Sequence, residues 1–196
     1  MVVASSLCAA MAIFLTGGTG KTANTIGHLL QNASIPFVVG SRRGEAAAPA
    51  GMVTAKFDWL DPSTFPNPFQ YNFPAGQRIS TIYLVLAGAD LAAAQAFIDY
   101  AFKTHQVKRF VLLAGGTTKL GDSYYGQIWQ HLLDLGVEYC ILRPTWFMGT
   151  DHPTFENLDS RYVYLCRKFL HQASSHDDPE RGKNLFSLWR WKGCIY

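Results

Sequence analysis

The chain has 196 residues, enough for one sizeable core and too few for two ordinary catalytic domains. With 48% hydrophobic, 14% aromatic and 16% charged residues, its composition is that of a packed globular protein and excludes disordered, collagen-like and coiled-coil chains. The 17 basic and 14 acidic residues are mixed along the chain and give a formal charge of +3, so neither nucleic acid nor an anionic membrane is expected as a partner.

The first apolar run, Leu7 to Leu15, resembles the middle of a secretion signal. It lacks the basic segment that precedes such a run, and it leads into glycines without a usual cleavage site. It is also too short to span a bilayer, which needs about 20 apolar residues. We therefore interpret residues 12–16 as a buried first strand.

The rest of the first 142 residues alternates between strand and helix patterns. Helical spacing of apolar residues predicts helices over the ranges 21–32, 90–104 and 125–135, the last ended by Gly136 in a left-handed cap. Short apolar runs predict five more strands, at 36–40, 52–57, 79–86, 109–114 and 137–142. Strands apolar on both faces and separated by helices predict an α/β fold, a Rossmann-like doubly wound parallel sheet with helices on both faces.

The sequence changes in composition after residue 148, and residues 149–196 are expected to form a divergent polar and aromatic tail. One amphipathic helix is predicted there, from Tyr162 to Leu170, with Asp159 or Ser160 as its cap. The last twelve residues are rich in aromatic side chains, so they either fold back onto the domain or favour association.

A glycine motif, Gly17-x-x-Gly20-x-x-Ala23, lies between the first strand and the first helix. Small residues there allow a tight turn and let a pyrophosphate approach the backbone N–H groups at the helix start. We predict that the cofactor contacts come from Gly17, Gly18, Thr19, Gly20, Lys21, Thr22 and Ala23. A purely structural turn is the alternative. A P-loop is excluded, because that motif requires glycine at the position of Leu15.

The second strand ends in Ser41, Arg42 and Arg43, where an NAD site usually has an acidic residue for the ribose 2′-hydroxyl. Two cations beside a hydroxyl favour NADPH, with Ser41 and Arg42 as contacts. The alternative is that the arginines only solvate a loop. Asp58 follows the third strand and is predicted to accept a hydrogen bond from the adenine amino group; capping a helix at 62–65 is the other interpretation.

Neither Tyr124 nor Tyr125 begins a catalytic dyad of the Tyr-x-x-x-Lys type, since Ile128 and Trp129 stand four residues after them. Ketone reduction needs that dyad to protonate the alkoxide, whereas hydride addition to an iminium carbon yields a neutral amine directly. The sequence therefore favours an iminium acceptor and identifies no catalytic residue.

Cysteines and histidines give no support for a metal site or a disulfide framework. The four cysteines (Cys8, Cys140, Cys166 and Cys194) are far apart, and the histidines are spread over different predicted elements. This pattern fits a reducing compartment, so a cytoplasmic protein without a bound metal is expected.

Several separated motifs resemble the NmrA-like atypical short-chain dehydrogenases, and within them the fungal festuclavine and agroclavine dehydrogenases of ergot alkaloid biosynthesis. They are Leu15-Thr-Gly-Gly-Thr-Gly-Lys-Thr22, Phe57-Asp-Trp-Leu-Asp61, Tyr83-Leu-Val85, Arg109-Phe-Val-Leu-Leu113 and Leu142-Arg-Pro-Thr-Trp-Phe-Met148. The resemblance implies a Rossmann domain over residues 11–148 and an N-terminal extension over residues 1–10. It also implies NADPH as hydride donor and a small-molecule alkaloid substrate, a clavine iminium derived from chanoclavine-I aldehyde.

By position, the resemblance places Gly17, Gly20 and Ala23 at the pyrophosphate and Arg42 at the 2′-phosphate. Thr145, Trp146 and Phe147 would border the nicotinamide and the substrate. Because the resemblance stops after Met148, the tail is expected to be a replacement that impairs the enzyme. An NADP(H)-sensing regulator and an inactive truncated reductase are the alternatives, and a homo-oligomer stays open.

Overall fold

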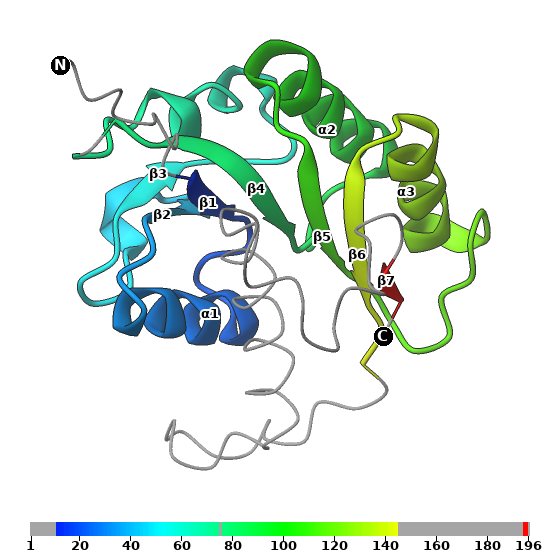
Figure 1. Ribbon diagram of the computed structural model, residues 1–196, viewed down its shortest axis with the longest axis horizontal. Helices are drawn as coiled ribbons and strands as arrows, with labels where there is room; N and C mark the ends of the chain where they lie inside the picture. Colours follow the sequence, from blue (N-terminus) through cyan, green and yellow to red (C-terminus); the bar gives the residue numbers. More distant parts are fainter. Residues whose placement is uncertain (1–10, 75, 145–193, 196) are drawn as a thin grey trace, which may run out of the picture.

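A computed structural model describes residues 11–74, 76–144 and 194–195. Its centre is one parallel sheet of seven strands in the order β3-β2-β1-β4-β5-β6-β7 (Figure 1). The strands are β1 (Met11–Leu15), β2 (Phe37–Ser41), β3 (Thr54–Lys56), β4 (Arg78–Leu84), β5 (Arg109–Leu113), β6 (Glu138–Leu142) and β7 (Cys194–Ile195). The predicted strands are all present, and β7 is an addition that the sequence analysis missed.

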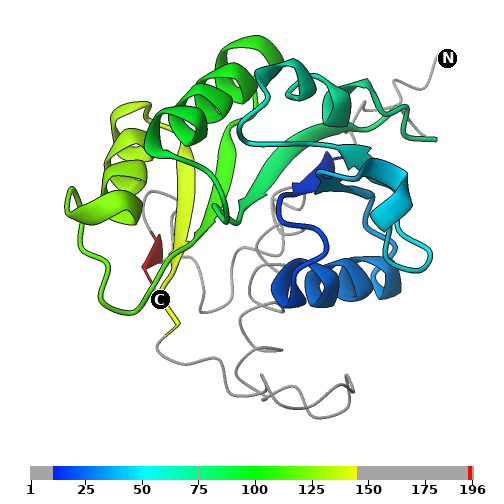
Figure 2. The same cartoon turned by 180° about the vertical axis from the view of Figure 1, so that it is seen from behind.

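Helices cover both faces of the sheet. Helix α1 (Lys21–Asn32) lies on one face, and α2 (Leu91–His105) and α3 (Ser123–Asp134) lie together on the other (Figures 1 and 2). Short 3-10 turns, η1 (Gly44–Ala47), η2 (Pro62–Thr64) and η3 (Asn67–Gln70), connect β2 to β3 and β3 to β4. The predicted doubly wound α/β architecture is confirmed. No helix in the described ranges is both long enough and apolar enough to cross a bilayer.

Alternation along each strand divides the core into two layers. In β1, Leu15 faces α1 and packs with Ala23, whereas Phe14 faces the opposite layer, which also holds residues of α2 and α3. The ring of Phe14 lies edge-on to Phe57, with centroids 5.2 Å apart, and to Phe97 of α2 at 6.0 Å. Such edge-to-face pairs add roughly 0.5–1.5 kcal/mol each to the burial of apolar area.

Element boundaries differ from the predictions by a few residues. Helix α3 begins at Ser123, two residues before the expected start, and Gly136 has φ +69°, as expected for a left-handed cap. Strand β7 pairs with β6 in the register Cys140 to Cys194, so a segment assigned to the tail supplies a sheet strand. The predicted helix over residues 162–170 lies outside the described residues.

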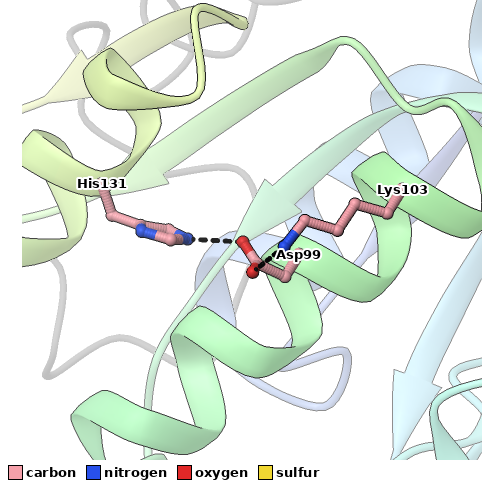
Figure 3. A network of polar contacts seen from close by, with 3 residues as sticks. All are labelled: Asp99, Lys103 and His131. Atoms are coloured by element: carbon pink, nitrogen blue, oxygen red, sulfur yellow. Dashed lines mark hydrogen bonds and ion pairs between the residues drawn. The ribbon is translucent and has the colours of Figure 1, made fainter.

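A polar network connects the two helices that share a face (Figure 3). Asp99 of α2 accepts hydrogen bonds from Lys103 (2.5 Å) and, across the helix–helix contact, pairs with His131 of α3 at 2.8 Å. Burial by itself would raise the pKa of Asp99, but the bonds from Lys103 and His131 outweigh it and hold the pKa below its ordinary value. The carboxylate therefore favours the docked arrangement of α2 and α3.

Candidate functional site

The site lies at the carboxyl edge of the sheet, where β1 and β4 are neighbours. From β1 the chain continues to β2 and β3 on one side, and from β4 it continues to β5 and β6 on the other. A crevice between strands whose connections diverge is the usual ligand site of an open α/β sheet. The predicted glycine motif follows β1 and therefore lies at this edge of the sheet, where the connections diverge.

Three glycines shape the turn between β1 and α1, each for a different reason. Gly17 has φ +66°, and a side chain there would place its Cβ 2.9 Å from the Cβ of Val85. Gly18 packs so closely on β2 that a Cβ would lie 1.7 Å from Cγ1 of Val39. Gly20 begins α1 as its N-cap residue and donates its N–H to the carbonyl of Gly17 at 2.8 Å.

The start of α1 can accept an anion. Gly20 provides no capping side chain, and the first turn contains no acidic residue. Within the described part of the chain, the N–H groups of Thr19, Thr22 and Ala23 make no hydrogen bond. Unsatisfied N–H groups and the positive end of the helix dipole together favour a phosphate or another anion at this position.

The structure divides the predicted pyrophosphate residues into two groups. The N–H of Gly18 is bonded to the carbonyl of Gly40 at 3.0 Å, and that of Gly20 is taken by Gly17, so these two glycines shape the loop. The side chain of Ala23 is fully buried against β1 and can serve a ligand only through its backbone. Thr19, Lys21 and Thr22 stand at the exposed mouth of the turn, with Thr22 half-buried.

Thr16 holds β1 and β4 together at the switch point, the place in the sheet where the chain connections diverge. The sequence analysis did not assign this role. Its fully buried hydroxyl donates to the carbonyl of Tyr83 at 2.9 Å and accepts from the N–H of Val85 at 2.7 Å. The hydroxyl therefore holds the ends of β1 and β4 together beneath the glycine turn. The available signal was a hydroxyl residue at the end of an apolar strand, where a buried polar group requires partners.

Two cations follow β2, as the sequence predicted. The side chains of Arg42 and Arg43 are exposed and form no ion pair with any described residue. Ser41 is buried, and its Oγ accepts the backbone N–H of Arg43 at 3.3 Å, so its hydroxyl helps to hold the turn. The edge of the sheet next to the glycine turn thus carries charge that could complement a phosphate.

Asp58 follows β3 at the same edge. Its Oδ1 accepts the N–H of Leu60 at 3.1 Å, and its backbone N–H donates to Oγ1 of Thr64 at 2.9 Å. The cap of the following 3-10 turn is Asp61, whose Oδ1 accepts the N–H of Ser63. The interpretation of Asp58 as that cap is therefore wrong, and its assignment to adenine stays a prediction.

The loops after β5 and β6 are bonded to each other on the other side of the switch point. The N–H of Gly116 donates to the carbonyl of Pro144 at 3.0 Å, and Nη2 of Arg143 donates to the carbonyl of Gly116 at 2.7 Å. The chain beyond Pro144, including the predicted substrate residues Thr145, Trp146 and Phe147, lies outside the described residues.

Tyr124, at the start of α3, is one of the two tyrosines tested above for a catalytic dyad. Its hydroxyl donates to the carbonyl of Ala89 at 3.0 Å. Burial, with smaller contributions from the charges of Tyr125 and Asp90, raises the pKa of Tyr124 to about 12. A hydroxyl so held is a structural donor between the starts of α3 and α2 and is a poor proton source near neutral pH.

Comparison with solved structures places the sheet among Rossmann folds. A Rossmann-fold NAD(P)-binding family protein from Shigella flexneri superposes with a TM-score of 0.63 at 20% identity, over 85% of this chain and 89% of that one. An NADPH-dependent quinone oxidoreductase from Escherichia coli superposes with a TM-score of 0.53 at 21% identity, over 69% and 49% of the two chains. These likenesses show the fold. No family model matches the sequence.

Sequence comparison finds closer relatives. Agroclavine dehydrogenase from Claviceps fusiformis is 38% identical over 176 residues, 88% of this chain and 57% of the relative. Festuclavine synthase II from Penicillium roqueforti is 40% identical, and festuclavine dehydrogenase from Aspergillus fumigatus 39% identical, each over 142 residues, 70% of this chain and 48% of the relative. The chain thus spans about half the length of the curated relatives it matches.

The extent of these alignments bears on the predicted tail. A match over 88% of a 196-residue chain is longer than its first 148 residues, so the Claviceps alignment extends past Met148. That extent does not fit a tail unrelated throughout to these relatives, while the domain boundary itself stays a prediction. The predicted resemblance is confirmed: the chain is a Rossmann-fold homologue of the fungal agroclavine and festuclavine dehydrogenases.

Proposed function

We propose that this chain is an NADPH-dependent reductase that converts a clavine iminium, derived from chanoclavine-I aldehyde, into a clavine such as agroclavine or festuclavine. The observation that carries the proposal is the 35–40% identity to proteins named agroclavine dehydrogenase and festuclavine synthase. The alkaloid would be its small-molecule partner. A cytoplasmic location and the absence of nucleic-acid and membrane partners are part of the same proposal, and its oligomeric state stays open.

The glycine turn and the start of α1 fit a dinucleotide. When bound, NADPH supplies the hydride, and the chain supplies binding and orientation. The N–H groups of Thr19, Thr22 and Ala23 would hold the pyrophosphate against the helix start. The glycines at 17 and 18 bring that backbone close to the ends of the strands, because neither leaves room for a Cβ.

The preference for NADPH over NADH rests on the cations behind β2. An NAD site offers a carboxylate to the ribose 2′-hydroxyl there, whereas this chain offers Arg42 and Arg43. A guanidinium matches the geometry and charge of a 2′-phosphate and can bond it through two nitrogens. Arg42 is the residue directly after the Ser41 that ends β2, which makes it the first candidate.

Titration of the purified chain with NADPH and NADH tests this preference. We expect NADPH to bind at least about tenfold more tightly. Arg42→Gln should weaken NADPH binding by roughly 10–100-fold and leave NADH within about twofold. Arg78→Gln is the matched control, since Arg78 is also exposed but lies at the amino end of β4. Equal affinities for the two cofactors, or an Arg42 variant that binds NADPH normally, would remove the assignment.

The environment of Tyr124 supports an iminium acceptor. The hydroxyl of Tyr124 is committed to the carbonyl of Ala89, and its raised pKa makes it a weak acid. Hydride addition to an iminium carbon consumes the positive charge and requires no proton in that step, whereas ketone reduction requires one. The chain's residues near the start of α3 therefore suit the first acceptor better than the second.

Turnover is tested with NADPH and chanoclavine-I aldehyde under conditions in which the iminium forms. Oxidation of NADPH that depends on the aldehyde, together with a clavine product identified by mass spectrometry, would support the reductase. Arg42→Gln should raise the KM for NADPH and leave kcat nearly unchanged, because it removes a binding contact remote from the hydride. Tight NADPH binding without aldehyde-dependent oxidation would contradict the reductase and favour an NADP(H)-sensing regulator or an inactive chain.

A further inference from the structure

Strand β3 ends beside the end of β2. A third cation, Lys56, therefore lies at the carboxyl edge of the sheet, where Arg42 and Arg43 follow β2. In the parallel pairing of the two strands, Lys56 is the register partner of Ser41, and the N–H of Phe57 donates to the carbonyl of Ser41 at 2.9 Å. Lys56 is therefore level with the last residue of β2, one position before Arg42. The sequence analysis assigned no role to this lysine.

The turn after β2 packs directly over Lys56. Gly44 has φ +58°, and a Cβ at that position would lie 3.5 Å from the Cβ of Lys56. This contact brings the backbone of the Arg43 turn against the stem of the lysine. Arg42, Arg43 and Lys56 thus come from two adjacent strand ends and share one edge of the sheet.

The ammonium group of Lys56 is available to a ligand. It is exposed, and it forms no ion pair with any residue that the structure describes. The nearby carboxylate of Asp61 is held in its own turn by the hydroxyl of Ser63 at 2.6 Å and by the N–H of Ser63 at 3.1 Å. The pKa of Asp61 is lowered chiefly by the bond from the Ser63 hydroxyl. The backbone bond from Ser63 and the charge of Lys56 contribute less.

We propose that Lys56 is a phosphate-binding residue that, together with Arg42, determines the preference for a 2′-phosphorylated adenosine. The proposal rests on the proposed function and deepens it. A phosphate monoester carries about −1.5 to −2 charges near neutral pH, so one guanidinium leaves roughly half of the charge unmatched. An ammonium on a flexible stem can supply the remainder without the fixed geometry that a guanidinium demands.

Two adenosine fragments provide the test, because they report on this edge without the nicotinamide or any turnover. Binding of 2′,5′-ADP and of 5′-AMP is measured by calorimetry on the full chain. Lys56→Gln should weaken 2′,5′-ADP binding by about three- to tenfold and change 5′-AMP binding by less than about twofold. Lys108→Gln is the matched control, since Lys108 is exposed and precedes β5 at the opposite edge of the sheet.

The Lys56→Gln variant keeps the backbone carbonyl that accepts Nδ2 of Asn67, so it is expected to fold, and circular dichroism verifies this. Added to Arg42→Gln, it should abolish the remaining advantage of 2′,5′-ADP over 5′-AMP. Normal 2′,5′-ADP binding by a folded Lys56→Gln overturns the role of Lys56 alone. If the unmodified chain binds both fragments equally, the proposed NADPH preference fails, and the role of Lys56 fails with it.

Discussion

Gly18→Ala is the substitution whose cost can be worked out most directly from the structure. The new Cβ would lie 1.7 Å from Cγ1 of Val39, whereas non-bonded carbons rest about 3.5–4 Å apart, so a gap of about 2 Å must open. Val39 is fully buried and β-branched, which leaves it little freedom to turn aside. Withdrawing the loop instead would break the 3.0 Å bond from Gly18 to the carbonyl of Gly40.

Overpacking of this kind costs about 1–3 kcal/mol, and a withdrawn loop would lose a hydrogen bond worth about 1 kcal/mol together with its packing, so by either route Gly18→Ala should lower the free energy of unfolding by about 1–3 kcal/mol. Urea denaturation measures this value. Val39→Ala removes Cγ1, the nearest of the clashing atoms, and leaves the carbonyl oxygen of Gly40 at 2.9 Å from the new Cβ. The double variant should therefore be about 1–2 kcal/mol more stable than the sum of the two single effects predicts.

Gly88→Ala is the control for this reasoning. Gly88 has φ +82°, and a Cβ there would meet no atom within 4 Å, so only backbone strain of about 1 kcal/mol is expected, and Val39→Ala should not relieve it. If the effects of Gly18→Ala and Val39→Ala add to within about 0.5 kcal/mol, the packing explanation for Gly18 is refuted.

Thr16→Val should cost about 1–3 kcal/mol in urea denaturation, because it leaves the buried N–H of Val85 without its acceptor, while the carbonyl of Tyr83 keeps the bond from the Thr16 N–H; Thr16→Ser, which keeps the hydroxyl, should cost less. Burial lowers the pKa of His105 below 6.5, so the folded state favours the neutral ring. The neutral ring therefore contributes to the free energy of unfolding above about pH 6.5, and this contribution is lost as the pH falls. His105→Phe should therefore lose less stability than the natural chain between about pH 7.5 and 5.5, and an equal loss would contradict this cause. Glu138→Gln should cost about 2 kcal/mol, because the Arg109 side chain that it pairs with is only 6% exposed, whereas Lys103→Gln, in a pair with an exposed lysine, should cost under about 1 kcal/mol.

The fold could be predicted because most of its helices and strands are marked by patterns of neighbouring residues. Apolar runs closed by glycine or proline marked the strands, and the spacing of apolar residues marked α1 with the bounds that the structure has. Since crossovers between parallel strands are right-handed, the alternation of elements left few arrangements to consider. Strand β7 escaped prediction because two residues carry no periodicity, and only the neighbouring β6 makes them a strand.

The candidate site was predictable only where its residues follow one another in the chain. The glycine motif and Arg42 could be found because the turn and the strand end are each a few residues long. Thr16 acts on a strand 67 residues away, so its role becomes visible only when β1 and β4 are known to be neighbours. Lys56 reads in the sequence as an ordinary surface lysine after a short strand.

Parallel pairing changes the meaning of such residues, because it aligns the ends of strands that are distant in sequence. Ser41 and Lys56 are level only because β2 and β3 run side by side in one register, and a shift by one residue would send the lysine to the other face of the sheet. The parallel pairing of β1 with β2 in turn brings Val39 against Gly18 and thereby requires the middle glycine of the turn. A motif read from the chain therefore identifies where a phosphate can approach, while the register of the sheet decides which side chains, beyond the motif, can meet its charge.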